Sequence, residues 1–213
     1  MRAVRRRALE LEEAAPLDTI RHVLTMFLGV GVGPLLLLWL LVHPFVGFWR
    51  RVGPWWTYVV VGGSIVAVAA LLARSSAWLV AADYGTRWPL VAAGLVCLGV
   101  SARMRLAVFR QLGAKAFIGL PELAPERYPM QLLRTGPYAR VRHPRYVQFV
   151  LGILGYALIA NHLAGYVVWL AWLVGVYPIV WFEERELHER FGAEYEDYCR
   201  RVPRFIPRRR RPV

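Results

Sequence analysis

The chain has 213 residues, of which 57% are hydrophobic, and a formal net charge of +13 that arginine dominates. Its mean hydropathy is +0.39, and the apolar residues form long runs instead of short periodic stripes, which excludes an ordinary soluble domain and indicates several membrane spans. The arginines gather beside the apolar runs, which favours anionic lipid headgroups as their partners and argues against nucleic acid.

Three apolar runs are predicted to be transmembrane helices in residues 22–110. Gly33 and Pro34 predict a kink or break in the first. The third is expected to leave the membrane as a helix that continues through Arg110. The runs are residues 23–42 or 23–48, then 55–73 and 88–102. A segment of mixed charge, residues 1–21, precedes them.

Residues 111–207 are predicted to form the functional core. The part 111–145 is too charged to span a membrane, and two apolar helices follow it at 146–160 and 166–182. Each is about 22–25 Å long at 1.5 Å per residue, slightly short of a hydrocarbon core of about 30 Å. A tight helical hairpin, with its turn at 161–165, therefore fits better than two independent spans. Such a hairpin returns both of its ends to the same side of the membrane.

The chain after the hairpin is charged but keeps a periodic apolar pattern. Residues 183–202 have one apolar helical face, which predicts an amphipathic helix in the membrane interface, divided at Gly192. A basic tail, residues 208–213, ends the chain. The predicted fold is an all-α integral membrane protein with about five transmembrane segments, a C-terminal helical hairpin and an interfacial amphipathic helix. The basic stretch 111–145 and the tail are expected on the cytoplasmic side, while the basic N-terminus leaves its own side open.

Charged residues flank the predicted hairpin on both sides. Arg142 and His143 precede it, and the tandem pair Glu183-Glu184 follows it. Adjacent carboxylates repel each other and need cations nearby, so the hairpin is expected to form a pocket that suits a zwitterionic ligand. Each feature alone also fits an ordinary helix start or membrane border. The joint spacing favours the pocket.

These residues carry a family resemblance. Arg142-His143-Pro144-Arg145-Tyr146, followed by the hairpin and Glu183-Glu184, resembles the signature of the membrane methyltransferases, which include isoprenylcysteine carboxyl methyltransferase and the phospholipid N-methyltransferases. Supporting matches are Gly136-Pro137-Tyr138, the Phe-Gly-x-x-Tyr-x-x-Tyr pattern at 191–198 and the closing segment 201–207. The resemblance extends over about residues 100–207. It implies S-adenosylmethionine as the cofactor and a lipid-soluble methyl acceptor that enters from the bilayer.

The resemblance also implies roles for single residues. His143, together with Arg142, would hold the carboxylate of the cofactor, and Glu183 and Glu184 would take its amino group or ribose hydroxyls. We expect two arginines to steer an anionic acceptor, and a further set to line the cavity. The steering residues are Arg185 and Arg201, and the lining residues are Gly136, Pro137, Tyr138 and Tyr146. We expect replacement of Arg204 to matter less than replacement of His143.

Several alternatives stay open at this level. Membrane sterol reductases, which use NADPH, share a similar C-terminal region, and a non-catalytic membrane scaffold is the third reading. The sequence does not identify the methyl acceptor. Prenylated cysteine, an aminophospholipid, a small thiol and a quinone-like or other isoprenoid lipid all stay open. No metal site is expected, because the five histidines are scattered, with His162 exposed at the hairpin turn. The arginine bias, with almost no lysine, points to a GC-rich bacterial genome, so the expected location is a bacterial plasma membrane. The sequence does not indicate an oligomeric state.

Overall fold

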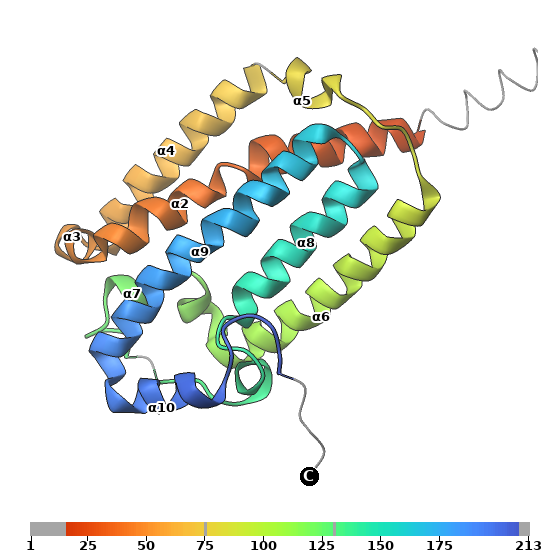
Figure 1. Ribbon diagram of the computed structural model, residues 1–213. Coiled ribbons are helices and arrows are strands. Elements are labelled where there is room, and N and C mark those ends of the chain that lie inside the picture. Colours follow the sequence, from red (N-terminus) through yellow and green to blue (C-terminus); the bar gives the residue numbers. More distant parts are fainter. Residues whose placement is uncertain (1–15, 75, 130, 209–213) are drawn as a thin grey trace, which may run out of the picture.

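The computed structural model describes residues 16–74, 76–129 and 131–208, which form a bundle of long helices (Figure 1). Four helical segments within these residues are long and apolar enough to cross a membrane: Pro16–Val52, Pro54–Arg74, Trp88–Leu123 and Leu163–Phe191. The shorter apolar helix α8 (Pro144–Ala160) joins them. The prediction of an all-α membrane protein with about five apolar segments is confirmed. Most of the predicted N-terminal segment and of the basic tail lies outside the described residues.

The first segment, Pro16–Val52, is broken where the sequence predicts. A π-helical stretch, η1 (Phe27–Val32), ends at Gly33, whose amide donates to the carbonyl of Leu28 at 2.8 Å. Pro34 has no amide hydrogen and its ring crowds the preceding turn, so the regular ladder cannot pass through it. The segment continues as α2 (Leu35–Val42), η2 (His43–Phe45) and α3 (Val46–Val52).

The next helices are α4 (Pro54–Arg74), α5 (Ala77–Ala81), α6 (Trp88–Phe117) and α7 (Leu120–Leu123). Helical structure therefore reaches further into the polar stretch than the sequence predicts. Gly113, with φ 71° and ψ 168°, interrupts α6 and separates its long body from a last turn at 114–117. The remaining stretch is irregular apart from η3 (Gly136–Ala139).

The predicted hairpin is present and consists of α8 and α9 (Leu163–Phe191). Asn161 ends α8 in the left-handed conformation, φ 52°, and its amide donates to the carbonyl of Ala157 at 2.8 Å. The turn is shorter than predicted, and α9 runs without a break from its apolar part to Phe191. Gly192, at φ 50° and ψ −128°, ends α9 and precedes α10 (Ala193–Arg201), so the predicted division at Gly192 is correct.

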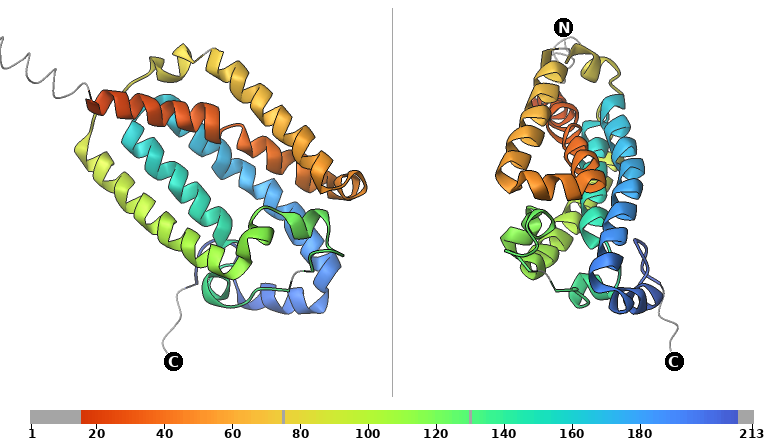
Figure 2. Two further views of the ribbon diagram at one scale, coloured as in Figure 1. Left: turned by 180° about the vertical axis from the view of Figure 1, so that it is seen from behind. Right: turned by 90° about the vertical axis from the view of Figure 1, so that its left-hand side faces the viewer.

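The long helices lie side by side in the order α6, α8, α9, the first segment and α4 (Figure 2). Small residues bring α6 and α8 close together. A Cβ atom added to Gly94 would lie 2.7 Å from the carbonyl oxygen of Gly155, which is less than real contacts allow. Close backbone approach at small residues is a common way for helices to associate in membranes.

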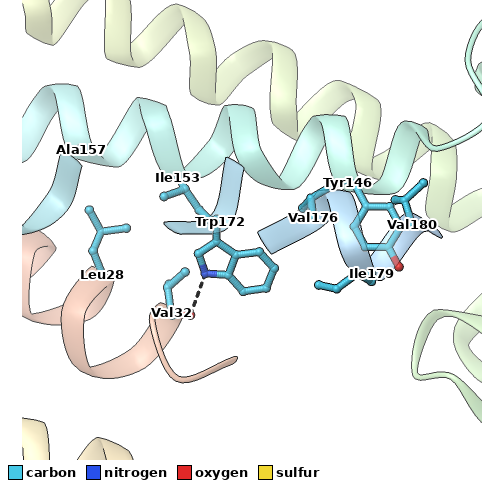
Figure 3. Packing of buried hydrophobic residues seen from close by; sticks show 9 residues of the cluster. All are labelled: Leu28, Val32, Tyr146, Ile153, Ala157, Trp172, Val176, Ile179 and Val180. Carbon is cyan, nitrogen blue, oxygen red and sulfur yellow. Dashed lines mark hydrogen bonds between the residues drawn. The ribbon is translucent and has the colours of Figure 1, made fainter. Parts of the chain in front are cut away.

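The buried core lies between the hairpin and the first segment (Figure 3). Trp172 of α9 is 1% exposed, and its indole nitrogen donates to the carbonyl of Val32 at 3.1 Å. The carbonyl lies at the break before Pro34, so a neighbouring helix satisfies a group near the interrupted ladder. The cluster consists of Leu28, Val32, Tyr146, Ile153, Ala157, Trp172, Val176, Ile179 and Val180.

Candidate functional site

A cavity lies at the end of the hairpin where α8 begins and the polar part of α9 starts. Its walls come from α6, α7, the loop before α8, both hairpin helices and α10, and its volume is about 70 Å³, within an atom-free region of about 650 Å³ that includes its open mouth. The juxtaposition of Arg142 and His143 with the glutamate pair, predicted from the hairpin, is therefore present. The lining residues are Leu112, Ala116, Glu122, Gln131, Leu132, Leu133, Tyr138, Arg142, His143, Arg145, Tyr146, Glu183, Leu187, Phe191, Tyr195 and Tyr198.

Glu184 is the centre of a buried ionic network beside this cavity. Its Oε1 accepts hydrogen bonds from Nε and Nη2 of Arg142 at 3.1 and 2.8 Å and from Nε2 of His143 at 3.0 Å. Arg204 donates to both carboxylate oxygens. Glu184 is only 7% exposed and does not line the cavity, so protein groups already satisfy its carboxylate.

The same network fastens the chain after α10 to the loop before α8. The amides of Arg142 and His143 donate to the carbonyls of Pro203 and Arg204 at 2.9 and 3.2 Å. The Arg142 guanidinium also donates to the carbonyl of Val202 at 2.7 Å. The sequence predicted that Arg204 matters less than His143. In the structure Arg204 directly contacts Glu184. Hydrogen bonds to that carboxylate raise the pKa of the Arg204 guanidinium.

Glu183, unlike Glu184, keeps a carboxylate oxygen that no protein group satisfies. It lines the cavity, and its Oε2 is buried without a hydrogen-bond partner. Nδ1 of His143 lies 3.8 Å from that oxygen. One carboxylate oxygen with unused acceptor capacity therefore faces the cavity, where it can take a cationic or hydroxyl group of a ligand.

Aromatic rings form one wall of the cavity. The Tyr198 hydroxyl donates to the carbonyl of Tyr138 at 2.6 Å, which connects α10 to η3. Burial raises the pKa of Tyr198 to about 12, and burial together with nearby Glu184 also raises the pKa of Tyr195. These phenols are therefore neutral at ordinary pH and present flat, uncharged faces to the cavity.

The structure brings most of the predicted cofactor residues together. Tyr138, Arg142, His143, Tyr146 and Glu183 line the cavity, whereas Gly136, Pro137 and Glu184 lie beside it. A residue with a side chain would not fit at position 136. The φ angle of Gly136 is 56°, and an added Cβ would lie 2.2 Å from the side-chain nitrogen of Gln111.

The two predicted steering arginines lie elsewhere. The Arg185 side chain is 59% exposed and pairs with Glu189, and the Arg201 side chain is 62% exposed and pairs with Asp197. Neither lines the cavity. A helix turns about 100° per residue, so a residue two positions after Glu183 points to a different side of α9. The tandem motif could not show this without a fixed helix orientation.

Sequence reasoning missed Glu122, a residue of α7 that lies at the junction of two hollows. Glu122 and Arg145 line both the polar cavity and a neighbouring apolar hollow. Nε2 of His43 is buried without a hydrogen-bond partner and lies 3.9 Å from Oε2 of Glu122. The remaining walls of the apolar hollow are Leu35, Leu38, Trp39, Val42, Thr57, Tyr58, Val61, Ile118, Gly119 and Leu123. No local sequence signal marks Glu122, because its partners come from distant segments.

Comparisons with known proteins give a consistent family signal. A family model described as phospholipid methyltransferase matches residues 89–194. The nickel-cobalt-cadmium resistance protein NccN of Alcaligenes xylosoxydans xylosoxydans is 30% identical over 159 residues, which is 75% of this chain and 65% of that protein. Methanethiol S-methyltransferase 2 of Bradyrhizobium diazoefficiens is 41% identical over 72 residues, 33% of this chain and 27% of that enzyme.

A more distant relative belongs to the alternative class. Delta(14)-sterol reductase LBR of Gallus gallus is 26% identical over 149 residues, which is 66% of this chain but 23% of that protein. The chain thus spans less than two thirds of the length of each of these curated relatives. No solved structure matches the chain.

Proposed function

Because residues 89–194 belong to the phospholipid methyltransferase family, we propose that this chain is a membrane-embedded methyltransferase that binds S-adenosylmethionine at the hairpin ends. The observation that carries the proposal is Glu183, a carboxylate with an unpartnered buried oxygen in a cavity that also contains guanidinium groups. The methanethiol S-methyltransferase relative supports the methyltransferase class. The sterol reductase alternative rests on a relative of which the chain spans 23%.

The residues of the cavity fit the groups of this cofactor. The ammonium group or a ribose hydroxyl suits Glu183, and the carboxylate suits the cationic side at Arg142 and Arg145. Since Arg142 and His143 already bind Glu184, we assign Glu184 to positioning these two residues instead of contacting the cofactor. The adenine ring suits the aromatic wall at Tyr195 and Tyr198.

When bound, the cofactor supplies an electrophilic methyl group on a sulfonium sulfur. The protein must align the acceptor with that methyl group and exclude water. Apolar side chains such as Leu112, Leu133 and Leu187 on the cavity wall serve the second purpose. We place the cavity at the cytoplasmic face, because the basic stretch around it agrees with the positive-inside rule.

The apolar hollow beside Glu122 is our candidate for the acceptor. A lipid-soluble acceptor would lie among Leu38, Val61 and their neighbours, with its reactive end at Glu122 and His43. Nε2 of His43 has no hydrogen-bond partner, so it is a polar atom that the reactive end of an acceptor can contact.

Calorimetric titration of the full chain in nanodiscs tests the cofactor assignment. We expect binding of S-adenosylmethionine and S-adenosylhomocysteine and none of NADPH. Glu183→Gln should weaken binding about ten- to hundredfold, the equivalent of losing roughly 1.5–3 kcal/mol from a charge-assisted contact. Glu189→Gln is the matched control, because Glu189 lies on the same helix with a side chain that is 71% exposed. Binding of NADPH alone would indicate a sterol-type reductase. Binding of none of the three ligands would indicate a non-catalytic membrane scaffold.

Blocking the apolar hollow tests the acceptor assignment separately. Leu38→Trp should leave cofactor binding unchanged and abolish methyl transfer to lipid acceptors in a radiolabel assay. Leu154→Trp is the control, because it fills a different apolar groove, between α8 and α9. If Leu154→Trp alone stopped transfer, the acceptor would enter by that groove.

A further inference from the structure

The opposite end of the hairpin brings together His22, Asp83 and His162. This end is the one where the chain passes from α8 into α9 (Figure 1), about 25 Å along α8 from the cavity. Each of the three residues offers one ligand-capable atom, and these atoms lie within 4.8 Å of one another. The sequence gave no hint of this cluster, because its members come from the first helix, the loop before α6 and the hairpin turn.

His162 is the central member of the cluster. It is 0% exposed, so the exposure expected from its position in a turn is wrong. Its Nδ1 lies 2.8 Å from the carbonyl oxygen of Ala160 and therefore carries the hydrogen that this bond needs. Its Nε2 is left with a lone pair, has no hydrogen-bond partner, and lies 3.7 Å from Oδ2 of Asp83. A buried polar atom without a partner is costly, and a ligand in that position would remove the cost.

The other two members are arranged in the same way. Nδ1 of His22 lies 2.6 Å from the carbonyl oxygen of Asp18, which leaves its Nε2 for another partner. Oδ1 of Asp83 accepts hydrogen bonds from Arg21 and from the amide of Gly85, while Oδ2 faces His162. In each residue one polar atom is held by the protein and the other is left for the cluster. Such outer hydrogen bonds are what orients histidine and carboxylate ligands in metal sites.

The backbone around the cluster is firmly connected. The amide of Tyr84 donates to the carbonyl of Asn161 at 3.1 Å, and the amide of Leu163 donates to the carbonyl of Ala82 at 3.0 Å. Arg21 donates from Nε to the carbonyl of Ala160 at 3.0 Å, which connects the first helix to the same turn. The three side chains are thus presented by segments whose relative positions are fixed before any ligand arrives.

We propose that His22, Asp83 and His162 bind a divalent transition-metal ion of the Zn²⁺, Co²⁺ and Ni²⁺ class. Two imidazole nitrogens and one carboxylate oxygen form a donor set for these ions, whereas Mg²⁺ and Ca²⁺ prefer oxygen ligands alone. Ligand atoms about 2.0–2.2 Å from a tetrahedral ion lie roughly 3.3–3.6 Å apart. The ligand atoms of His162 and Asp83 are 3.7 Å apart and all three lie within 4.8 Å of one another, so the side chains have to close in around the ion. The positive charge of Arg21 is already paired with Asp18 and Asp83. Three protein ligands leave one position for water or another ligand.

Cobalt titration of the full chain tests the proposal. The protein, held in nanodiscs and freed of metal with a chelator, is titrated with Co²⁺ while the visible absorption of tetrahedral Co²⁺ is recorded. We expect a saturable signal at one equivalent that Zn²⁺ displaces. His22→Gln, Asp83→Asn and His162→Gln should each weaken binding at least about tenfold. His188→Gln, a histidine of α9 outside the cluster, should leave it unchanged.

The competing reading is an imidazolium–carboxylate pair between His162 and Asp83 that only stabilises the turn. His22→Gln separates the two readings, because His22 takes no part in that pair. If the wild-type chain showed no saturable signal, or if His22→Gln bound Co²⁺ as tightly as the wild type, the proposal would be overturned. His22→Gln also decides the matter if His162→Gln does not fold.

Discussion

Replacement of Glu184 by glutamine is the sharpest test of how the cavity is built. The side chain keeps its shape but loses the charge that faces Arg142, His143 and Arg204. The Arg142 side chain is 11% exposed, so its charge would remain buried without a full counter-charge. The Arg204 side chain is 33% exposed, and water would screen its share of the loss.

Breaking a buried ion pair by removing one partner costs about 3–5 kcal/mol. Because Arg204 is partly solvated and glutamine keeps one acceptor oxygen, we expect Glu184→Gln to lower the free energy of unfolding by about 3 kcal/mol. Reversible unfolding in mixed micelles, followed by circular dichroism, measures this value. A loss below about 1 kcal/mol would show that the network does not hold the segments together.

Glu183→Gln provides the matched comparison in the neighbouring position. One of its carboxylate oxygens has no hydrogen-bond partner, so we expect a change in unfolding free energy below about 1 kcal/mol. The two substitutions should therefore separate stability from ligand binding. If Glu183→Gln proved the more destabilising of the two, the roles that we assign to the glutamates would have to be exchanged.

Two further pairs of substitutions are measured by the same unfolding assay. Gly94→Ala should cost about 1–3 kcal/mol, because its Cβ would meet the carbonyl of Gly155, whereas Gly99→Ala on the same helix has open space and should be neutral or stabilising. Equal effects would contradict the close packing of α6 and α8. Tyr198→Phe should cost about 1 kcal/mol by losing its 2.6 Å bond to a backbone carbonyl. Tyr195→Phe should cost less, since that hydroxyl is buried without a partner; the reverse order would refute the hydrogen-bond assignment.

The helical hairpin, and the proximity of the residues at its two ends, could be predicted from the sequence because their signals are local. Apolar runs, the Gly33-Pro34 break and the helix end at Gly192 each depend on a few neighbouring residues. If a hairpin is predicted, the proximity of His143 to Glu183 and Glu184 follows from its topology alone. The family resemblance then narrowed the chemistry, and the match over residues 89–194 confirms that resemblance.

The rest of the site depends on where separate segments meet, which spacing does not encode. Two adjacent glutamates looked equivalent, yet one is satisfied by protein groups and the other faces the cavity. Arg185 carried a charge suited to steering but lies on another side of α9. Glu122 meets His43, and His162 meets Asp83 and His22, only through long-range packing, so no local pattern could have marked these two residues.

The attachment of Arg204 to Glu184 has a consequence for how the protein matures. Arg204 follows every apolar helix of the described chain, and its bonds close the network beside the cavity. The polar site therefore takes its final form only after the last of these helices has been made and placed. A chain in which only one of the two hairpin helices is inserted would leave Arg142 and Glu184 on different sides and have no closed site. If the cavity binds the cofactor as we propose, only correctly assembled molecules can bind it.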